Sequence, residues 1–337
     1  MQIKNDYNLI NLNTFGINVN AKLFVVMENE ADLVELFSLP EFKNNKKIFL
    51  GGGSNVLFTE NFDGIVVLNK LKGIKIIDEN SETVLVRSMG GELWHDLVSF
   101  AVNNNCWGIE NLSLIPGTVG AAPMQNIGAY GAELKDTLFN VEAFEIENGV
   151  KRIFSGEECE LGYRDSVFKN KLKGKYFISA VTLRLSKIPK PNISYKILSD
   201  YLEKNNIKIN GPKDISDAVA EIRRSKLPDP KIIGNAGSFF KNVFVNKIQL
   251  ETLLKTFPEI SYFKEDSVVK IPAGWLIEQC GWKGKRIGNV GVHNKQALVL
   301  VNYGGAKGSE IIELANEIIA SVKEKFGLEL LPEVNIV

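Results

Sequence analysis

Hydrophobic and polar positions alternate in short blocks over the first 70 residues, and these blocks predict a compact α/β unit. Apolar runs of strand length, rich in β-branched and aromatic residues, lie at 23–26, 47–50 and 65–68. Between the first two, the stretch from Glu30 to Ser38 carries apolar residues at helical spacing. A glycine cluster follows the second strand, and this order is typical of a parallel sheet that presents its carboxyl edge to a ligand.

The middle of the chain, from about 74 to 187, is predicted to contain more strands. The expected strands are 74–77, 83–87, 141–146, 151–154 and 177–185, with one helix at 93–103. Gly149 separates two of these strands, as in a hairpin turn.

A third section begins near Pro189-Lys190-Pro191, which we interpret as a boundary linker. Asp214 is the expected cap of a helix that starts at the next residue. The expected helices are 197–205, 215–227, 248–257, 273–280 and 309–326, and the expected short strands are 268–271 and 298–302. The last residues, 330–337, are predicted to form a strand held in the fold rather than a frayed end.

Composition and charge exclude several classes of protein. Forty Lys and Arg residues balance forty Asp and Glu residues, which argues against a general nucleic-acid or anionic-membrane partner. Three scattered cysteines and two distant histidines argue against a disulfide framework and against a metal centre. We find no signal-like start and no apolar run near the roughly 18 residues of a membrane span. These features predict a cytoplasmic protein, which we expect to be a monomer.

Two glycine clusters carry the strongest functional signal. The long glycine loop, residues 113–131, contains four glycines, and the short glycine loop, residues 50–55, lies about 60 residues upstream. A backbone without side chains can approach a flat or anionic group closely, and its N–H groups can point at phosphate oxygens. Glycine runs often only turn corners, but a loop this long and this poor in side chains needs something to face.

The spacing of these glycines excludes the two commonest phosphate-binding motifs. Neither loop is a Gly-x-Gly-x-x-Gly turn that opens a helix, and neither ends in Gly-Lys-Ser/Thr. Two glycine loops from adjacent α/β units indicate instead an extended dinucleotide between two subdomains. Ser54 and Asn55 are candidate donors to its pyrophosphate, and 116–131 would supply further amides and a wall for a ring system.

Five separated motifs then resemble one enzyme family. They are Gly-Gly-Gly-Ser-Asn-Val-Leu at 51–57, Ile-Pro-Gly-Thr-Val-Gly at 115–120, Gln-Asn-Ile-Gly-Ala-Tyr-Gly at 125–131, Gly-Tyr-Arg-Asp-Ser at 162–166 and Gly-Ser-Phe-Phe-Lys-Asn at 237–242. In this order they resemble the UDP-N-acetylenolpyruvoylglucosamine reductases of bacterial peptidoglycan precursor synthesis, over about residues 13 to 335.

This resemblance implies an α+β fold, a cofactor and a domain plan. Two α/β subdomains, 1–70 and 71–188, would form an FAD-binding domain of the vanillyl-alcohol-oxidase type, followed by an α+β substrate-binding domain, 189–329, and a strand, 330–337, that returns to the active site. FAD would be bound non-covalently and NADPH would donate the hydride. The implied cofactor-binding residues are Gly51, Gly52, Gly53, Ser54, Asn55, Ile115, Pro116, Gly117, Gly120, Ala121, Gln125, Asn126, Gly128, Ala129, Tyr130 and Gly131.

The chemistry of such a reductase requires a cation, a proton donor and a flavin. Hydride is delivered to the methylene carbon of the enolpyruvyl ether, and the neighbouring carbon collects negative charge before it takes a proton. The resemblance assigns the cation to Arg164, the proton donor to Ser238 and a further acid in the site to Glu333. On local sequence alone, the ordinary alternatives are an arginine paired with Asp165, a serine in a turn and a carboxylate on a solvated tail.

The sugar-nucleotide substrate needs donors for its diphosphate and a flat surface for its uracil. The resemblance implies Tyr163, Tyr195, Lys226, Asn242 and Gln296 as substrate-binding residues, with Tyr195 on the mobile loop of the family's longer branch. On sequence alone, an exposed tyrosine, a solvated basic face and surface amides are the alternatives. The chain departs from the family at the residue after Asn242, where valine replaces a common proline.

Two other functions remain open at this point. One is an oxidase on the same flavin scaffold, which passes electrons to oxygen and often attaches its flavin through His or Cys, although neither residue type occurs in the glycine loops. The other is a non-catalytic module that binds a flavin or a sugar nucleotide. Turnover with NADPH distinguishes the reductase from both.

Overall fold

The computed structural model describes residues 1–265 and 268–337, which form two compact units. Unit 1 comprises Met1–Tyr7, Ala21–Gly52 and Asp63–Ser225, and unit 2 comprises Asn8–Asn20, Gly53–Phe62 and Lys226–Val337. Within the described residues, no helix is both long enough and apolar enough to cross a membrane.

The first sheet of unit 1 confirms the α/β pattern predicted for the start of the chain. Its strand order is β1 (Lys4–Asn8), β2 (Asn20–Met27), β5 (Phe62–Asn69) and β3 (Lys46–Leu50). Strands β3 and β5 are parallel, with Leu50 opposite Leu68. Helices α1 (Ala31–Ser38) and α2 (Pro40–Lys43) bury Leu33, Leu36, Phe37 and Phe42 against this sheet. The short glycine loop therefore begins at the carboxyl end of a parallel strand.

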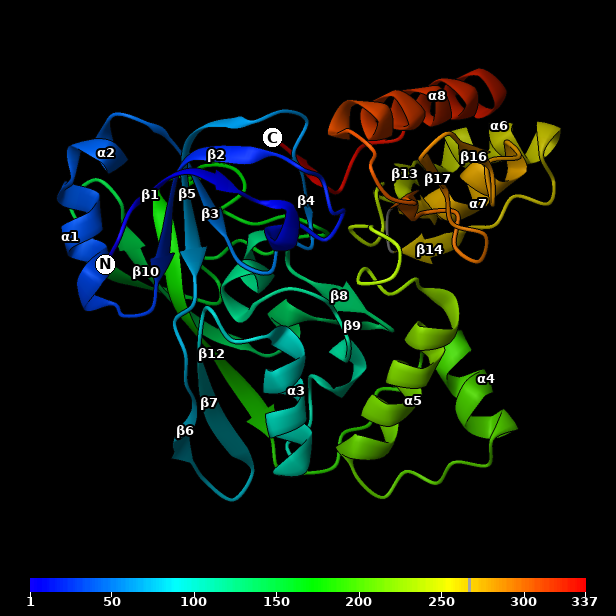
Figure 1. The fold of residues 1–337 in the computed structure, drawn as a ribbon. Helices are drawn as coiled ribbons and strands as arrows, with labels where there is room; N and C mark the ends of the chain where they lie inside the picture. Colours follow the sequence, from blue (N-terminus) through cyan, green and yellow to red (C-terminus); the bar gives the residue numbers. More distant parts are fainter. Residues whose placement is uncertain (266–267) are drawn as a thin grey trace. The chain divides into compact units, whose positions relative to one another are not determined.

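A five-stranded sheet forms the centre of unit 1 (Figure 1). Its strand order is β11 (Lys151–Ser155), β10 (Leu138–Glu145), β12 (Tyr176–Ser186), β7 (Thr83–Met89) and β6 (Ile74–Glu79), and each neighbouring pair is antiparallel. Gly149, at φ +72°, lies in the turn that joins β10 to β11. All five strands were predicted from the sequence, with boundaries that differ by a few residues.

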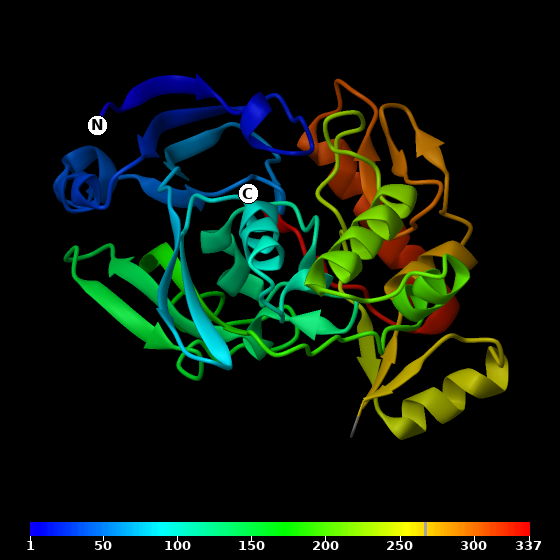
Figure 2. The same ribbon diagram turned by 90° about the horizontal axis from the view of Figure 1, so that it is seen from below.

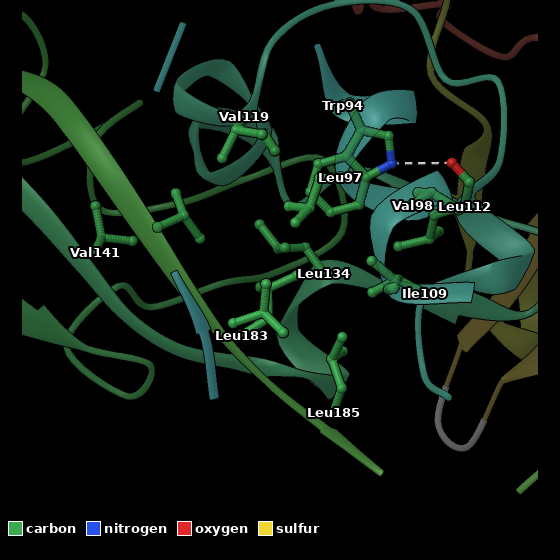
Figure 3. Close-up of a cluster of buried hydrophobic side chains, with 14 of the residues drawn as sticks. Trp94, Leu97, Val98, Ile109, Leu112, Val119, Leu134, Val141, Leu183 and Leu185 are labelled. Atoms are coloured by element: carbon green, nitrogen blue, oxygen red, sulfur yellow. Dashed lines mark hydrogen bonds between the residues drawn. The ribbon is translucent and has the colours of Figure 1, made fainter. Parts of the chain in front are cut away.

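Helix α3 (Trp94–Asn103) packs on this sheet and supplies the apolar floor beneath the long glycine loop. Its buried Trp94, Leu97 and Val98 lie in one cluster with Leu183 and Leu185 of β12 (Figure 3). The Trp94 indole Nε1 donates a hydrogen bond to the carbonyl oxygen of Leu112, 2.9 Å away, just before the loop begins (Figure 3). A buried aromatic with a satisfied N–H thus fixes where the loop starts.

The long glycine loop itself is built from short irregular elements. The loop contains the 3₁₀ helix η3 (Val119–Gln125) and the short strand β8 (Gly128–Ala129). It is flanked by the 3₁₀ helices η2 (Glu110–Leu112) and η4 (Leu134–Asp136) and by the short strand β9 (Ala132–Glu133). Hydrophobic periodicity does not predict elements this short.

Helices α4 (Lys196–Lys204) and α5 (Pro212–Lys226) lie side by side (Figure 1, Figure 2). Both pack onto Trp107. Their apolar residues, including Leu198, Ile215 and Val219, form this third cluster. The prediction that a substrate-binding domain begins at residue 189 stays a prediction.

The prediction that Asp214 caps α5 from outside the helix is wrong. The helix begins at Pro212, because proline suits the first turn, where its missing N–H costs nothing. Asp214 lies inside that turn and accepts hydrogen bonds from the N–H groups of Asn210 and Gly211, at 2.7 and 3.0 Å.

The described residues of unit 2 form small sheets, three α-helices and one 3₁₀ helix. The sheets are β13 (Val243–Val245), β15 (Val268–Ile271) and β14 (Phe263–Glu265); β16 (Arg286–Ile287), β17 (Val290–Val292) and β18 (Leu300–Asn302); and β4 (Val56–Leu57) with β19 (Asn335–Ile336). The 3₁₀ helix η1 (Ile10–Leu12) and helices α6 (Lys247–Thr256), α7 (Ala273–Gln279) and α8 (Gly308–Phe326) complete it. Strands β19 and β4 are parallel, so the C-terminal end is held in a sheet as predicted.

Candidate active site

The two glycine loops touch through backbone positions that have no room for side chains. A Cβ on Gly51 would lie 2.1 Å from Oγ1 of Thr118, and one on Gly52 would lie 2.9 Å from the Cα of Gly117. The Thr118 hydroxyl oxygen is buried and has no hydrogen-bond partner among the described residues. Glycine is therefore required here for packing, and the junction exposes a backbone poor in side chains, of the kind that can approach a dinucleotide closely.

The long glycine loop is fastened to the start of α3 and the end of β7. Gly117 accepts a hydrogen bond from the Trp94 N–H at 3.1 Å, and the Gly120 N–H donates to the Gly90 carbonyl at 2.8 Å. A Cβ on Gly120 would come within 3.0 Å of that same carbonyl oxygen. The loop is thus a fixed surface.

Three non-glycine residues of this loop adopt the left-handed conformation. Leu114, Asn126 and Tyr130 have φ values of +53°, +44° and +49°, a region that costs an L-residue about 1–2 kcal/mol. The buried Asn126 side chain accepts a hydrogen bond from the Lys135 N–H at 3.0 Å and donates to the carbonyl of Gly162, also at 3.0 Å. Side-chain hydrogen bonds therefore hold a backbone that does not follow a regular element.

Arg164 lies directly on the long glycine loop. Its Nη2 donates a hydrogen bond to the carbonyl of Gly128 at 2.9 Å, and its own backbone is left-handed, at φ +52°. Two residues later, the buried Ser166 hydroxyl donates to the carbonyl of Met124 at 2.7 Å. With the bond from Asn126 to Gly162, the 162–166 turn is attached to the loop at three points. The structure thus brings the predicted cation to the predicted cofactor surface.

Tyr195 contacts the far end of the same loop. Its ring meets that of Tyr130 edge to face, with centroids 5.4 Å apart and planes at 74°. Burial raises the pKa of the Tyr130 phenol, and the positive charge of Arg223 acts in the opposite direction. Tyr195 and Tyr130 therefore form one aromatic surface in unit 1.

Arg223 is a candidate that sequence reasoning missed. Its Nε is buried with no hydrogen-bond partner among the described residues, and burial lowers its pKa from the ordinary value of an arginine. A buried cation with an unmet donor suits an anionic ligand. The usable signal was its spacing from Lys226, three positions on in α5, which places both cations on one helix face.

In unit 2, Ser238 and Glu333 lie on paired backbone segments. Ser238 forms a bridge with Val299, and the Glu333 N–H donates to the carbonyl of Phe239, the residue after Ser238, at 2.7 Å. Gly237 precedes the serine at φ +69°, a conformation that glycine adopts without strain. Both candidate side chains are half-buried. The prediction that Glu333 belongs to an ordered strand-like segment is confirmed.

Asn55 connects the short glycine loop to this C-terminal segment. Its Nδ2 donates to the carbonyl of Glu333 at 3.3 Å, and its own carbonyl accepts from the Asn335 N–H at 3.1 Å. A Cβ on Gly53 would lie 1.9 Å from the carbonyl oxygen of Leu12, so this turn also requires glycine. The role of Asn55 as a cofactor ligand stays a prediction.

The side chains of Asn242 and Gln296, which come from two other segments, both lie close to the first residues of α7. Oδ1 of Asn242 accepts a hydrogen bond from the Ala273 N–H at 3.1 Å, and a Cβ on Gly274 would lie 3.3 Å from Oε1 of Gln296. Val243, at the position where the family commonly has proline, begins β13 opposite Ile271.

His95, near the start of α3, supports the long glycine loop. His95 accepts a hydrogen bond from the Leu114 N–H on Nδ1 at 3.2 Å, and burial lowers its pKa, which favours the neutral ring that this bond needs. Across the described parts of the chain, no group of three His, Cys, Asp or Glu residues is placed to hold a metal ion.

The candidate residues divide between the two units. Unit 1 contains Tyr163, Arg164 and Tyr195; unit 2 contains Lys226, Ser238, Asn242, Gln296 and Glu333. In unit 1 they gather around the long glycine loop. In unit 2, Ser238, Asn242, Gln296 and Glu333 lie on the neighbouring segments 238–242, 296–299 and 331–335, whereas Lys226 is the last residue of α5.

Comparison with known proteins extends over the whole chain. A model of an FAD binding domain matches residues 21–152, and a model of the C-terminal domain of UDP-N-acetylenolpyruvoylglucosamine reductase matches residues 229–337. The UDP-N-acetylenolpyruvoylglucosamine reductase of Flavobacterium johnsoniae is 48% identical over 339 residues, 100% of each chain. That of Bdellovibrio bacteriovorus is 45% identical over 330 residues, 98% of each.

A solved structure supports the same fold. The crystal structure of UDP-N-acetylenolpyruvylglucosamine reductase from Thermus caldophilus matches with a TM-score of 0.69 at 22% identity, covering 100% of this chain and 99% of its own. The predicted α+β class, with an FAD-binding domain of the vanillyl-alcohol-oxidase type and a separate C-terminal domain, is confirmed. The chain therefore belongs to the UDP-N-acetylenolpyruvoylglucosamine reductase family.

Proposed function

We propose that Arg164, Ser238 and Glu333 carry out the chemistry of the reduction after which this family is named. The chain is an FAD-containing oxidoreductase that reduces UDP-N-acetylglucosamine enolpyruvate to UDP-N-acetylmuramate with NADPH, in bacterial peptidoglycan precursor synthesis. When bound, FAD supplies the hydride that adds to the methylene carbon of the substrate. The chain's own residues bind the substrate, hold the charge that develops and deliver the proton.

Arg164 holds the substrate carboxylate. Its planar fork of donors matches a carboxylate whose charge grows as the neighbouring carbon becomes enolate-like, so its hold strengthens in the transition state. The hydrogen bond from Nη2 to Gly128 fixes the guanidinium on the long glycine loop, where the cofactor residues are proposed. This bond also limits the side-chain entropy that the substrate would otherwise have to remove.

Ser238 delivers the proton to the carbon that bears the carboxylate. A serine hydroxyl is a weak acid, so it protonates only a strongly basic carbon such as this one. The observation that supports the assignment is the backbone pairing that holds the Glu333 segment beside the Ser238 segment, through Glu333 N–H and Phe239 O at 2.7 Å. Glu333 orients the charged intermediate and influences the proton that Ser238 carries.

The remaining candidates hold the sugar nucleotide and the cofactor. Tyr163 and Tyr195, the amides Asn242 and Gln296, and the cations Lys226 and Arg223 are proposed to bind the substrate. The residues proposed to bind FAD are those of the two glycine loops given above. We further propose that the enzyme is a cytoplasmic monomer and that its four sequence regions divide the binding of FAD and substrate as the family resemblance implies.

Half-reaction kinetics with Ser238→Ala test the central assignment. Reduction of the bound flavin by NADPH should stay within about twofold of the wild type, while its reoxidation by the enolpyruvyl substrate should slow by about 10²–10⁴-fold, as expected for a lost acid catalyst. Ser238→Cys, which keeps a proton on a similar side chain, should recover part of the second rate. Equal loss of both half-reactions would contradict the assignment.

The same experiment separates the other candidate functions. An oxidase would reoxidise rapidly with oxygen and show no dependence on the enolpyruvyl substrate, and a binding module would not bleach with NADPH at all. Absorbance of the flavin distinguishes all three outcomes.

A further inference from the structure

Asn111 is a buried amide at the entry to the long glycine loop, and no role in the reaction has been assigned to it above. It lies in η2 and is 1% exposed. Its Nδ2 donates two hydrogen bonds, to the carbonyl of Tyr130 and to the carbonyl of Asn192, each at 2.8 Å. One side chain therefore joins the end of the loop to a segment 81 residues further along the chain.

That second segment is the one that leads to Tyr195. Asn192 also binds the loop through its own side chain, because its Nδ2 donates a hydrogen bond to the carbonyl of Gly131 at 2.9 Å. Its Oδ1 accepts a hydrogen bond from the Ser194 hydroxyl at 2.8 Å, one residue before the tyrosine. The loop end at 130–131 and the 192–195 segment are thus linked by amide hydrogen bonds on both sides.

These hydrogen bonds act on backbone that no regular helix or strand stabilises. Tyr130 and Gly131 have φ values of +49° and +82°, and Tyr195 lies in an exposed stretch before α4, with 42% of its surface exposed. The edge-to-face contact of the Tyr130 and Tyr195 rings alone contributes only about 0.5–1.5 kcal/mol. The side-chain amide of Asn111 is the buried part of the connection.

Asn111 is itself rigidly supported. The buried Glu110 carboxylate accepts a hydrogen bond from the Gly108 N–H at 2.6 Å, and burial raises the pKa of this carboxyl. The Ser113 hydroxyl donates to the Glu110 carbonyl at 2.7 Å and lies 2.7 Å from the Ser216 hydroxyl of α5. A fixed donor can therefore impose its geometry on the two carbonyls it binds.

We propose that Asn111 is a positioning residue for substrate binding, which holds Tyr195 against Tyr130 by hydrogen-bonding Tyr130 and Asn192 at once. This inference rests on the proposed role of Tyr195 in holding the sugar nucleotide. It places the effect in the affinity for the substrate and in neither the proton transfer nor the reaction with NADPH.

Asn111→Asp is the direct test, because it keeps the shape and replaces the donor that faces two carbonyl oxygens with an acceptor. In the full-length, FAD-loaded enzyme, the KM for the enolpyruvyl substrate should rise by about tenfold or more, the size expected when a buried hydrogen-bonding pair is broken. Flavin reduction by NADPH, measured by stopped flow, should stay within about twofold. A KM that does not change overturns the inference.

The Tyr195→Ala background separates positioning from a general structural effect. If Asn111 acts through Tyr195, Asn111→Asp should add less than about threefold to the KM of Tyr195→Ala, because contacting residues in one network are not additive. A full tenfold rise in that background overturns the inference. If Tyr195→Ala itself leaves KM unchanged, both the inference and the proposed role of Tyr195 fall, whereas a rise in Tyr195→Ala without one in Asn111→Asp removes the inference alone.

Asn111→Ala gives a second variant, should Asn111→Asp fail to fold. It removes both donated hydrogen bonds without placing a carboxylate opposite the two carbonyl oxygens. The KM should rise by about threefold or more, and again not in the Tyr195→Ala background. An unchanged KM contradicts the proposal.

Discussion

The two units hold their candidate functional side chains by different means. In unit 1, Arg164 lies in a left-handed turn that is tied to the long glycine loop by the side chains of Asn126, Ser166 and Arg164 itself. In unit 2, Ser238 and Glu333 lie on extended segments that are paired through their backbones. We therefore expect activity to fall when polar residues remote from Arg164 are substituted in unit 1. In unit 2, we expect activity to fall mainly when the candidate residues themselves are substituted.

Among the substitutions in unit 1, Arg164→Lys should have the largest effect. Lysine keeps the charge but loses the planar fork that binds both Gly128 and a carboxylate. Because a lost donor to developing charge costs about 10²–10³-fold in kcat, reoxidation of the flavin by substrate should slow by that factor, with the reaction with NADPH preserved. Stopped-flow absorbance measures both. A loss below threefold would show that Arg164 does not hold the reacting charge.

This contrast also marks how much the sequence could predict. The strands and helices were predictable because each carries its own hydrophobic spacing, as at β3, α3 and α8. Glu333 was placed correctly in an ordered segment because apolar residues flank it on both sides. The start of α5 was misplaced by a few residues, because the capping preference of Asp214 competes with that of Pro212 for the first turn.

The contacts that shape unit 1 could not be predicted in the same way. Asn111 meets Asn192 across 81 residues, and Arg223 faces Tyr130 across a similar separation. Such pairs leave no periodic signal, since a single buried amide or arginine looks like a surface residue in the sequence. Only the fold brings them together.

Acid should destabilise unit 1 selectively. Arg87 and Lys151 hold the Glu142 carboxylate at 2.8 and 2.7 Å, and the hydrogen bond from Arg87 is the main reason that its pKa falls from 4.5 to about 2. Since the folded pKa is depressed, the stabilisation is complete above pH 4.5 and is lost as the pH falls toward 2. The shift corresponds to about 3 kcal/mol.

Hydrogen exchange between pH 5 and pH 2.5 measures this loss by region. Protection should fall first in β7, β10 and β11, and the amides of β17 and β18 should change less. Glu142→Gln, which cannot ionise, should be less stable at neutral pH and should lack this acid-dependent step. An equal loss of amide protection in both units would contradict the prediction that acid destabilises unit 1 selectively.

Within unit 1, the junction of the two glycine loops combines a backbone contact at Gly52 with a side-chain contact at Gly51. Gly52→Ala would push a Cβ against the Gly117 backbone at 2.9 Å, whereas at Gly51 the nearest atom is the side-chain oxygen of Thr118. Overpacking of this kind costs about 1–3 kcal/mol, so both alanine variants should bind FAD more weakly in fluorescence titrations. Adding Thr118→Ala should restore binding to Gly51→Ala but not to Gly52→Ala. Restoration of both would show that the backbone contact at Gly52 can yield.

Ser166→Ala should have the smallest effect and compares most directly with Ser238→Ala. The Ser166 hydroxyl is buried and donates to the Met124 carbonyl, so its removal leaves that acceptor unsatisfied and should lower the free energy of unfolding by about 1–2 kcal/mol. The turn that carries Arg164 then loses one of its three attachments, and kcat/KM should fall only severalfold. Ser238→Ala should show the reverse, with a large loss of reoxidation and an unchanged urea midpoint. Urea denaturation and half-reaction rates of the two variants test whether side-chain hydrogen bonds position Arg164 while backbone pairing positions Ser238. If both variants lost stability and reoxidation rate in parallel, the two serines would have the same role and this distinction would be wrong.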